Sequence, residues 1–301
     1  MTEHNPPTTD ELFKPLTDSV KAGNCVAVIG AGVSAGDYPL WSDLIQILRD
    51  RCGLKAEDFH SIDPLDIAET ARSKDDEAYH ATLTDVFKRK DAPQTALRYH
   101  LLARTKFISY VTLNFDPLLV DILSLHRNTY VSEYPWLSSE HNGNREVFHI
   151  HGRVWPDAGV RKHGVVLTRK DFDEAYNPYD SLLHAYLQTT FTQHDICFIG
   201  CNPTESNMHR LLRACKSIRD KMPSADDYRP PSWYLLWNDS SNLPPTLAEC
   251  GIRPVLYQPL NNAYVGLDRV LAYWAGQSAP KIRRPSSTPS VYSAEKEPDH
   301  G

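Results

Sequence analysis

The chain has 301 residues, with 32 basic and 38 acidic side chains and a formal net charge of −6. This length suffices for one large α/β domain or two ordinary ones, and the acidic balance excludes a surface that coats nucleic acid through clustered Lys and Arg. No apolar run approaches the length that spans a bilayer, and the six cysteines are scattered without a C-x-x-C pair. We therefore expect a soluble, cytoplasmic protein with reduced thiols, no membrane anchor and no strong nucleic-acid binding.

The N-terminal part of the chain predicts a strand, a tight turn and a helix. Residues 1–10 are typical of a flexible arm, and the spacing from Leu12 to Val20 predicts a short amphipathic helix. The apolar run 25–29 predicts a buried strand. Three glycines follow it, and then comes one face of a helix: Gly30, Gly32 and Gly36, then Leu40, Trp41, Leu44, Ile45 and Leu48.

The glycine turn is suited to hold a phosphate. Glycines allow a positive φ and a close approach of a ligand, and the first amides of a helix attract an anion. One extra residue separates Gly32 from Gly36, so the spacing departs from the G-x-G-x-x-G fingerprint of dinucleotide sites. Two alternatives stay open at this point: a turn that only packs a helix on a sheet, and the G-x-S-x-G nucleophile elbow of serine hydrolases around Ser34.

A group of helices separates this unit from the next strand. Residues 66–73, 75–90 and 95–104 are rich in charge and Ala and predict three helices, which form a helical insertion over about 54–105. The run 107–112 then predicts a strand that ends in Thr112-Leu-Asn-Phe-Asp116. Polar side chains at the carboxyl end of a strand mark the sites of open α/β sheets, so Asn114 and Asp116 are candidates, with helix capping as the alternative.

Two histidines end the next predicted strand, 146–152. His149 and His151 lie two residues apart and face the same side of that strand. No further ligands with matching spacing are evident, so we expect no metal site. We interpret His151, which precedes a glycine, as an accessible acid or base, and a core role stays open for His149.

The remaining pattern alternates strands and helices. Strands are expected over 164–168, 195–200, 233–237 and 254–258, and helices begin at Arg169 or extend over 180–193, 208–215 and 267–274; residues 276–301 are typical of a disordered tail. This alternation predicts an α/β fold: a Rossmann-like parallel sheet with helices on both faces and a helical insertion after the first βα unit, in one domain over 11–275.

Five of these segments occur in an order that resembles the sirtuin family. They are the turn Gly30-Ala-Gly-Val-Ser34, the segment Thr112-Leu-Asn-Phe-Asp116, the pair His151-Gly152, the turn Phe198-Ile-Gly200 and the strand end Leu236-Trp-Asn238. The two C-x-x-C pairs of the sirtuin zinc module are absent from the sequence. The segments Thr112–Leu119 and Leu167–Phe172 are similar to the bacterial sirtuin-like branch that hydrolyses NAD during antiviral defence.

The resemblance implies a role for each matched residue. Asn114 holds the ribose or an attacking water, Asp116 orients its neighbours and favours positive charge, and His151 is the general base. The implied NAD-binding residues are Gly30, Ala31, Gly32 and Ser34 at the pyrophosphate, Thr112 beside Asn114, Gly200 and Asn202 at the adenosine ribose, and Asn238 and Tyr257 at the adenine. No metal is implied.

The same resemblance implies hydrolysis of NAD to nicotinamide and ADP-ribose, with water as acceptor in place of an acyl-lysine. An uncontrolled NAD hydrolase is toxic, and the assigned elements leave no segment for a sensor domain. We therefore expect a homo-oligomer or a separate sensor or ATPase partner. A protein deacylase, a serine hydrolase built on Ser34, Asp116 and His151, and a non-catalytic module that binds NAD or ADP-ribose remain the alternatives.

Overall fold

The computed structural model describes most of the chain. The described residues are 8–58, 61–126, 129–135, 145–155, 164–203, 206–222, 230–238, 243–258 and 263–276. All of the predicted tail, 276–301, except Gly276, and most of the predicted N-terminal arm therefore lie outside the described residues.

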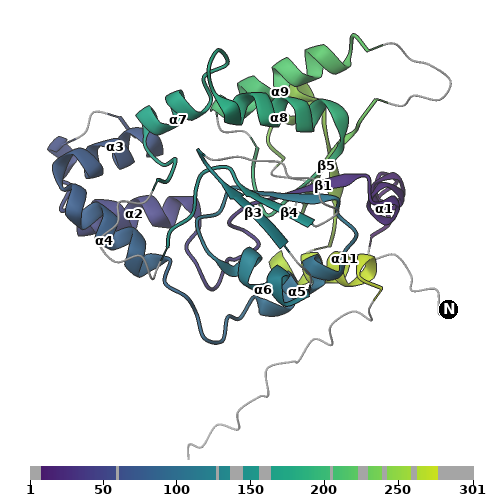
Figure 1. Cartoon of the computed structure of the whole chain (residues 1–301), viewed down its shortest axis with the longest axis horizontal. Coiled ribbons are helices and arrows are strands. Elements are labelled where there is room, and N and C mark those ends of the chain that lie inside the picture. The colour runs from purple at the N-terminus through teal and green to yellow at the C-terminus, as the bar shows by residue number, and fades with distance from the viewer. Residues whose placement is uncertain are drawn as a thin grey trace, which may run out of the picture.

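A seven-stranded sheet forms the centre of the molecule (Figure 1). All six pairs of neighbouring strands are parallel, in the order β3-β4-β2-β1-β5-β6-β7. The strands are β1 (Cys25–Ile29), β2 (Ser109–Thr112), β3 (Thr129–Glu133), β4 (Arg145–His149), β5 (Asp195–Ile199), β6 (Trp233–Trp237) and β7 (Ile252–Leu256). The predicted Rossmann-like parallel sheet is confirmed.

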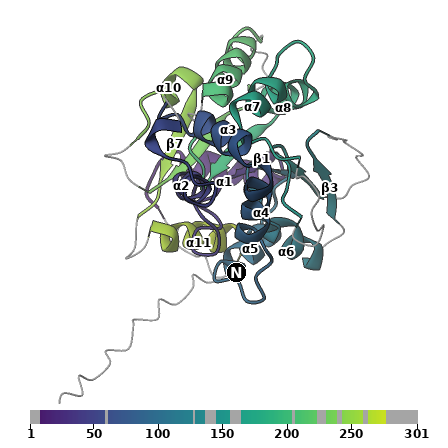
Figure 2. The same cartoon turned by 90° about the vertical axis from the view of Figure 1, so that its left-hand side faces the viewer.

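Helices cover both faces of this sheet (Figure 1). One face carries α7 (Arg169–Ala175), α8 (Leu182–Gln193) and α9 (Ser206–Arg219), and the other carries α5 (Ala96–Arg104), α6 (Leu118–His126) and α11 (Ala263–Trp274). The short α10 (Leu247–Cys250) packs against α9 (Figure 2). Helix α1 (Phe13–Ala22) packs against β1 and α11.

The predicted helical segment after the first βα unit is present. Helix α2 (Trp41–Arg51) is followed by the 3-10 turn η1 (Ala56–Asp58), α3 (Pro64–Lys74) and α4 (Asp76–Val86). Helices α3 and α4 pack on α2 at one end of the molecule, whereas α5 packs on α6 and α11 under the sheet (Figure 2).

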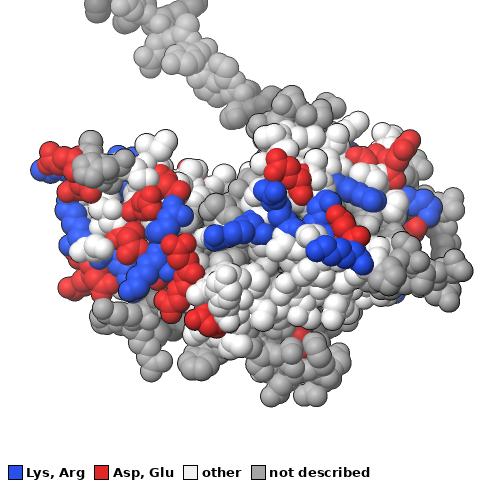
Figure 3. Space-filling model, turned by 90° about the horizontal axis from the view of Figure 1, so that it is seen from above, with Lys and Arg blue, Asp and Glu red and all other residues white. Residues whose placement is uncertain are grey.

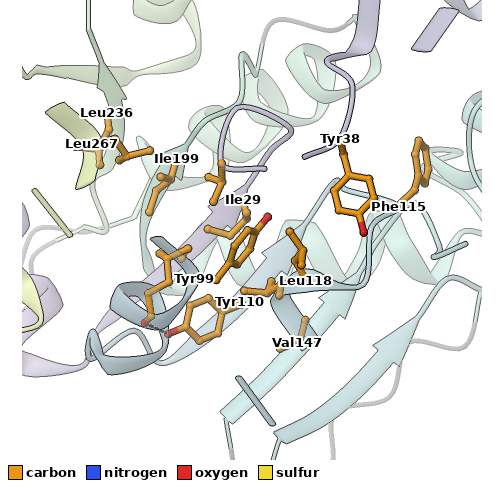
Figure 4. Close-up of a cluster of buried hydrophobic side chains, with 14 of the residues drawn as sticks. Ile29, Tyr38, Tyr99, Tyr110, Phe115, Leu118, Val147, Ile199, Leu236 and Leu267 are labelled. Carbon is orange, nitrogen blue, oxygen red and sulfur yellow. Dashed lines mark hydrogen bonds between the residues drawn. The ribbon is translucent and has the colours of Figure 1, made fainter. Parts of the chain in front are cut away.

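Apolar side chains of the sheet and helices form the core. The strands β1 and β5 are buried along their whole length, as unbroken apolar runs of a parallel sheet should be. Ile29, Tyr99, Tyr110 and Leu118 gather in one buried cluster between the sheet and the helices below it (Figure 4). This packing fixes the strand ends that carry the candidate site.

The structure differs from the sequence-based expectations in three places. The predicted strand over 164–168 is a loop, and its Val166 amide donates to the His151 carbonyl at 2.9 Å. A short apolar run does not by itself distinguish a strand from a buried loop. The half-exposed edge strand β3 and the single-turn helix α10 were not predicted.

Candidate functional site

The candidate site lies at the carboxyl edge of the central strands. In the sheet register, Ile29 of β1 pairs with Thr112 of β2 and with Ile199 of β5, and Thr112 pairs with His149 of β4. The segments that leave these four strands therefore lie side by side. The chain continues to one side of β1 through β2 and to the other through β5, which makes this edge a topological switch point, where open α/β sheets bind their ligands.

Two glycine turns pack directly against each other at this edge. The Gly32 amide donates to the Gly200 carbonyl at 2.7 Å. A Cβ on Gly30 would lie 2.2 Å from the Cβ of Cys201, and one on Gly32 would lie 2.8 Å from the Gly200 oxygen. Residues 30 and 32 must therefore be glycines, because the turns after β1 and β5 leave no room for a Cβ at either position.

The first turn differs from its expected structure in two ways. Of its three glycines only Gly36 has a positive φ, at 107°. Helix α2 begins at Trp41, so its first amides do not belong to the glycine turn. The amides of Val33 and Ser34 instead donate to the carbonyls of Gly30 and Ala31, at 3.0 and 3.2 Å. The turn is a compact unit closed by its own hydrogen bonds.

Buried polar side chains meet beneath this turn. Asn114 Nδ2 donates to the Gly30 carbonyl at 3.3 Å and to Ser34 Oγ at 3.4 Å. The Thr112 hydroxyl accepts the Asn114 amide at 3.1 Å, and Asp116 is hydrogen-bonded to both Ser34 and Asn114. We call Ser34, Asn114 and Asp116 the polar cluster; all three are at least nine-tenths buried.

The carboxyl of Asp116 is the ionisable group of the polar cluster. Burial raises its pKa to about 6, although hydrogen bonds from Ser34, the Leu118 amide and Asn114 oppose the rise. The group is therefore ionised at neutral pH and protonated in mild acid. Asp116 also accepts the Leu118 amide at 3.1 Å at the start of α6, which confirms the capping interpretation, while its role in the site stays a prediction.

His151 lies in the turn after β4, in an aromatic environment, and it is buried, so the expectation of an accessible histidine is wrong. Its ring is 4.9 Å from that of Phe172, and its Nε2 is 2.8 Å from the Tyr176 hydroxyl. Burial lowers its pKa to about 4, while a hydrogen bond to the Leu113 carbonyl opposes this. The imidazole is thus neutral at neutral pH, which is the state that accepts a proton.

His149 is a core histidine, one of the two interpretations left open by the sequence. It is fully buried, its Nδ1 contacts the Asn114 carbonyl at 3.1 Å, and burial together with the charge of Arg153 lowers its pKa to about 3. This ring holds the backbone of Asn114. The described residues contain no group of three or more His, Cys, Asp or Glu side chains that could hold a metal ion.

The remaining predicted residues lie farther along the same edge. Asn202 is an exposed residue after β5, Asn238 follows β6, and the Tyr257 amide donates to the Trp237 carbonyl at 2.9 Å after β7. Gly30 and Thr112 belong to the contacts of the polar cluster, whereas Asn238 and Tyr257 lie beyond β5 in the sheet order. Their place at the adenine stays a prediction.

The sequence did not point to two side chains of α5 that support the site. Arg98 Nη1 donates to the Val33 carbonyl at 2.6 Å while its Nε pairs with Asp268 of α11 at 2.6 Å. The Tyr99 hydroxyl lies next to Ser34 and Asn114. Neither residue belongs to a motif, because only the packing of α5 brings it to the turn.

Two surface hollows lie away from this edge. One of about 580 Å³ lies between α1 and the amino ends of β1 and β5, and one of about 600 Å³ lies between α3 and α7. Neither is lined by a predicted site residue. We place the candidate site at the carboxyl edge because buried, mutually hydrogen-bonded polar groups converge there. None of the described helices has the length and apolarity needed to cross a membrane.

Comparisons with known proteins agree with this arrangement. A model of the SIR2-like domain matches residues 108–255. The chain is 27% identical over 218 residues to Defense-associated sirtuin 2 of Bacillus subtilis, a match that covers 69% of this chain and 21% of that protein, so the chain spans about a fifth of the relative's length.

Solved structures of Sir2 proteins also match. A complex of a Sir2 homologue with NAD has 14% identity and a TM-score of 0.47, covering 91% of this chain and 97% of the other. A structure of a Sir2 enzyme has 13% identity and a TM-score of 0.44, covering 88% and 95%. The match to the SIR2-like domain thus extends from β2 into β7, and the turn Gly30–Ser34 precedes it in the chain.

Proposed function

We propose that the chain cleaves the bond between nicotinamide and ribose in NAD and releases nicotinamide and ADP-ribose. The observation that carries this proposal is the convergence of Ser34, Asn114 and Asp116 beneath the first turn, with the neutral His151 in the turn after β4. The match to the SIR2-like domain supports NAD as the substrate. The relative's name, a defence-associated sirtuin, supports a role in bacterial antiphage defence.

The chemistry requires stabilisation of positive charge and removal of a proton. Cleavage passes through an oxocarbenium-like ribose, which the ionised Asp116 favours electrostatically, while Asn114 holds the ribose or the attacking water. The water oxygen bonds to the anomeric carbon, and the bond to nicotinamide breaks with its electron pair on the nicotinamide nitrogen. His151 is the base on which a proton ends when the water loses one, and a positioned base of this kind contributes about 10²- to 10⁴-fold in rate.

NAD itself is proposed to extend along the carboxyl edge. Gly30, Ala31 and Gly32 border its pyrophosphate, Gly200 and Asn202 approach the adenosine ribose, and Asn238 and Tyr257 border the adenine. We also propose control by self-association or by a sensor or ATPase partner, because uncontrolled turnover depletes NAD.

The serine hydrolase is not favoured by the geometry. Ser34 Oγ contacts Asn114 and the Ala31 carbonyl, and no hydrogen bond joins it to a histidine within the described residues. A hydrolase triad needs its serine within reach of the histidine. Replacement of Ser34 by Ala should therefore weaken NAD turnover without abolishing it.

The decisive experiment follows NAD consumption by the purified chain, alone and with candidate activators, and quantifies nicotinamide and ADP-ribose. His151→Ala and Asn114→Ala should each reduce turnover at least 10²-fold. His100→Ala, which removes a histidine on α5 paired with His126, is the matched control and should retain turnover. Acceleration by an acetylated peptide would indicate a deacylase instead. NAD binding without product under every condition would indicate a binding module.

A further inference from the structure

One side chain in direct contact with the proposed base belongs to none of the sirtuin-like motifs. Tyr176 follows α7 and brings its hydroxyl within 2.8 Å of His151 Nε2. Both side chains are buried, at 3% and 7% exposure. The contact joins the segment after β4 to the end of α7 and thus lies within the candidate site.

The hydrogen bonds of His151 determine which atom can take a proton. The Leu113 carbonyl accepts a hydrogen bond from the ring, and because Nε2 faces Tyr176, we assign that bond to Nδ1. A neutral imidazole with a proton on Nδ1 has a single in-plane lone pair, which lies on Nε2. The Tyr176 hydroxyl therefore donates to that lone pair.

The aromatic neighbours keep the Tyr176 hydroxyl in place. Its ring stacks on Phe172, one helical turn earlier, with 5.7 Å between the centroids and 3° between the planes. The centroid of the Phe172 ring lies 4.9 Å from that of His151 and 6.5 Å from that of Trp41, and the pair with Trp41 is packed edge to face. Because Tyr176 is buried in this stack, it does not leave Nε2 without repacking of α7.

We propose that Tyr176 is a catalytic residue that carries the proton from the attacking water to His151. The step rests on the proposed NAD hydrolysis. As the water oxygen bonds to the anomeric carbon and nicotinamide leaves with the electron pair, the proton of the water passes to Tyr176 Oη. The phenolic proton passes at the same time to His151 Nε2. Tyr176 ends neutral, His151 ends as imidazolium, and its proton later returns to solvent.

The test compares Tyr176→Phe with Tyr110→Phe. Tyr110 is a matched control, because its buried hydroxyl also makes one short bond, to the Leu102 carbonyl at 2.7 Å, but lies in the core. With NAD as substrate, Tyr176→Phe should lower kcat by about 10²-fold or more and change KM less than threefold, while Tyr110→Phe retains kcat. We would also measure kcat in mixtures of H₂O and D₂O. The dependence of kcat on the fraction of D₂O should fit two protons in motion in the wild type and one proton in Tyr176→Phe.

Two kinetic outcomes would overturn the relay. A higher kcat in Tyr176→Phe would show that the hydroxyl only blocks the base, and an unchanged kcat would show that Tyr176 only packs. Nitrogen NMR of the NAD-free wild-type protein is independent of turnover. We expect a proton on Nδ1 of His151 and an Nε2 signal that shifts in Tyr176→Phe; a proton on Nε2 would refute the relay even in an inactive enzyme. An intact Tyr176–His151 bond without NAD cleavage would refute the hydrolase instead.

Discussion

The polar cluster and the interface of α3 and α7 differ in how much each polar contact should contribute to the stability of the fold. The polar cluster and its support by Arg98 contain few bonds, all buried. Where α3 meets α7, ion pairs are more numerous: Arg169 with Asp63 and Asp66, and Arg72 with Asp171. Lys and Arg alternate with Asp and Glu over this end of the surface (Figure 3). Because water screens exposed charges, the sparse buried contacts should determine stability and the dense exposed ones should add little.

The largest effect is expected at Arg98. Its side chain is 7% exposed, and Arg98→Met removes the partner of Asp268 and the donor to the Val33 carbonyl. The carboxylate of Asp268, only 20% exposed, is then left without this partner, and because breaking such a largely buried pair destabilises strongly we expect a loss of about 3 kcal/mol in the free energy of unfolding. Urea denaturation measures it. Arg98→Met combined with Asp268→Leu should recover part of the loss. A loss below about 1 kcal/mol in Arg98→Met would show that this buried contact contributes no more to stability than the exposed pairs do.

An effect of comparable size is expected at Asp116, where the difference in unfolding free energy between Asp116→Asn and wild type should depend on pH. Between the usual carboxyl pKa of 3.8 and about 6, the folded chain binds more protons at Asp116 than the unfolded chain. The contribution of Asp116 to stability therefore falls as pH rises through this interval, by about 3 kcal/mol in total. The lowered pKa values of His149 and His151 act with the opposite sign, because there the unfolded chain binds more protons.

Asp116→Asn keeps the shape of the side chain but removes the group that titrates, and with it the contribution to stability that falls as pH rises. The stability of the variant relative to wild type should thus rise by about 2 kcal/mol from pH 4 to pH 7, as measured by urea denaturation at each pH. A difference that stays constant with pH would show that Asp116 titrates as an exposed carboxyl does.

The sequence predicted the parts of this site that depend on local pattern. Asn114, Asp116 and His151 follow strands of a parallel sheet, and the carboxyl ends of such strands share one edge, so their proximity follows from the fold class. Arg98, Tyr99 and Tyr176 project from helices, and only tertiary packing brings them to that edge. No residue spacing encodes such contacts, just as the spacing of the glycines did not reveal that the turn after β5 packs against Gly30.

A smaller effect is expected inside the polar cluster. Ser34→Ala removes one neutral acceptor for Asn114 and one hydrogen bond to Asp116. We expect a loss of about 1 to 2 kcal/mol in unfolding free energy and a higher KM for NAD with a measurable kcat. Thermal unfolding and steady-state kinetics measure the two effects. Complete loss of activity in a folded Ser34→Ala protein would instead support the serine nucleophile.

The smallest effect is expected at the interface of α3 and α7. Arg169 pairs with Asp63 at 2.6 Å and Asp66 at 2.9 Å, but its side chain is 31% exposed and the two carboxylates are more exposed still. Arg169→Gln should therefore cost at most about 1 kcal/mol, and about 0.5 M salt should remove most of that difference by screening. Urea denaturation at low and high salt measures both. A loss as large as that of Arg98→Met, unchanged by salt, would mean that these pairs act as a buried network, and that α7 is held on α3 by charge rather than by its apolar face.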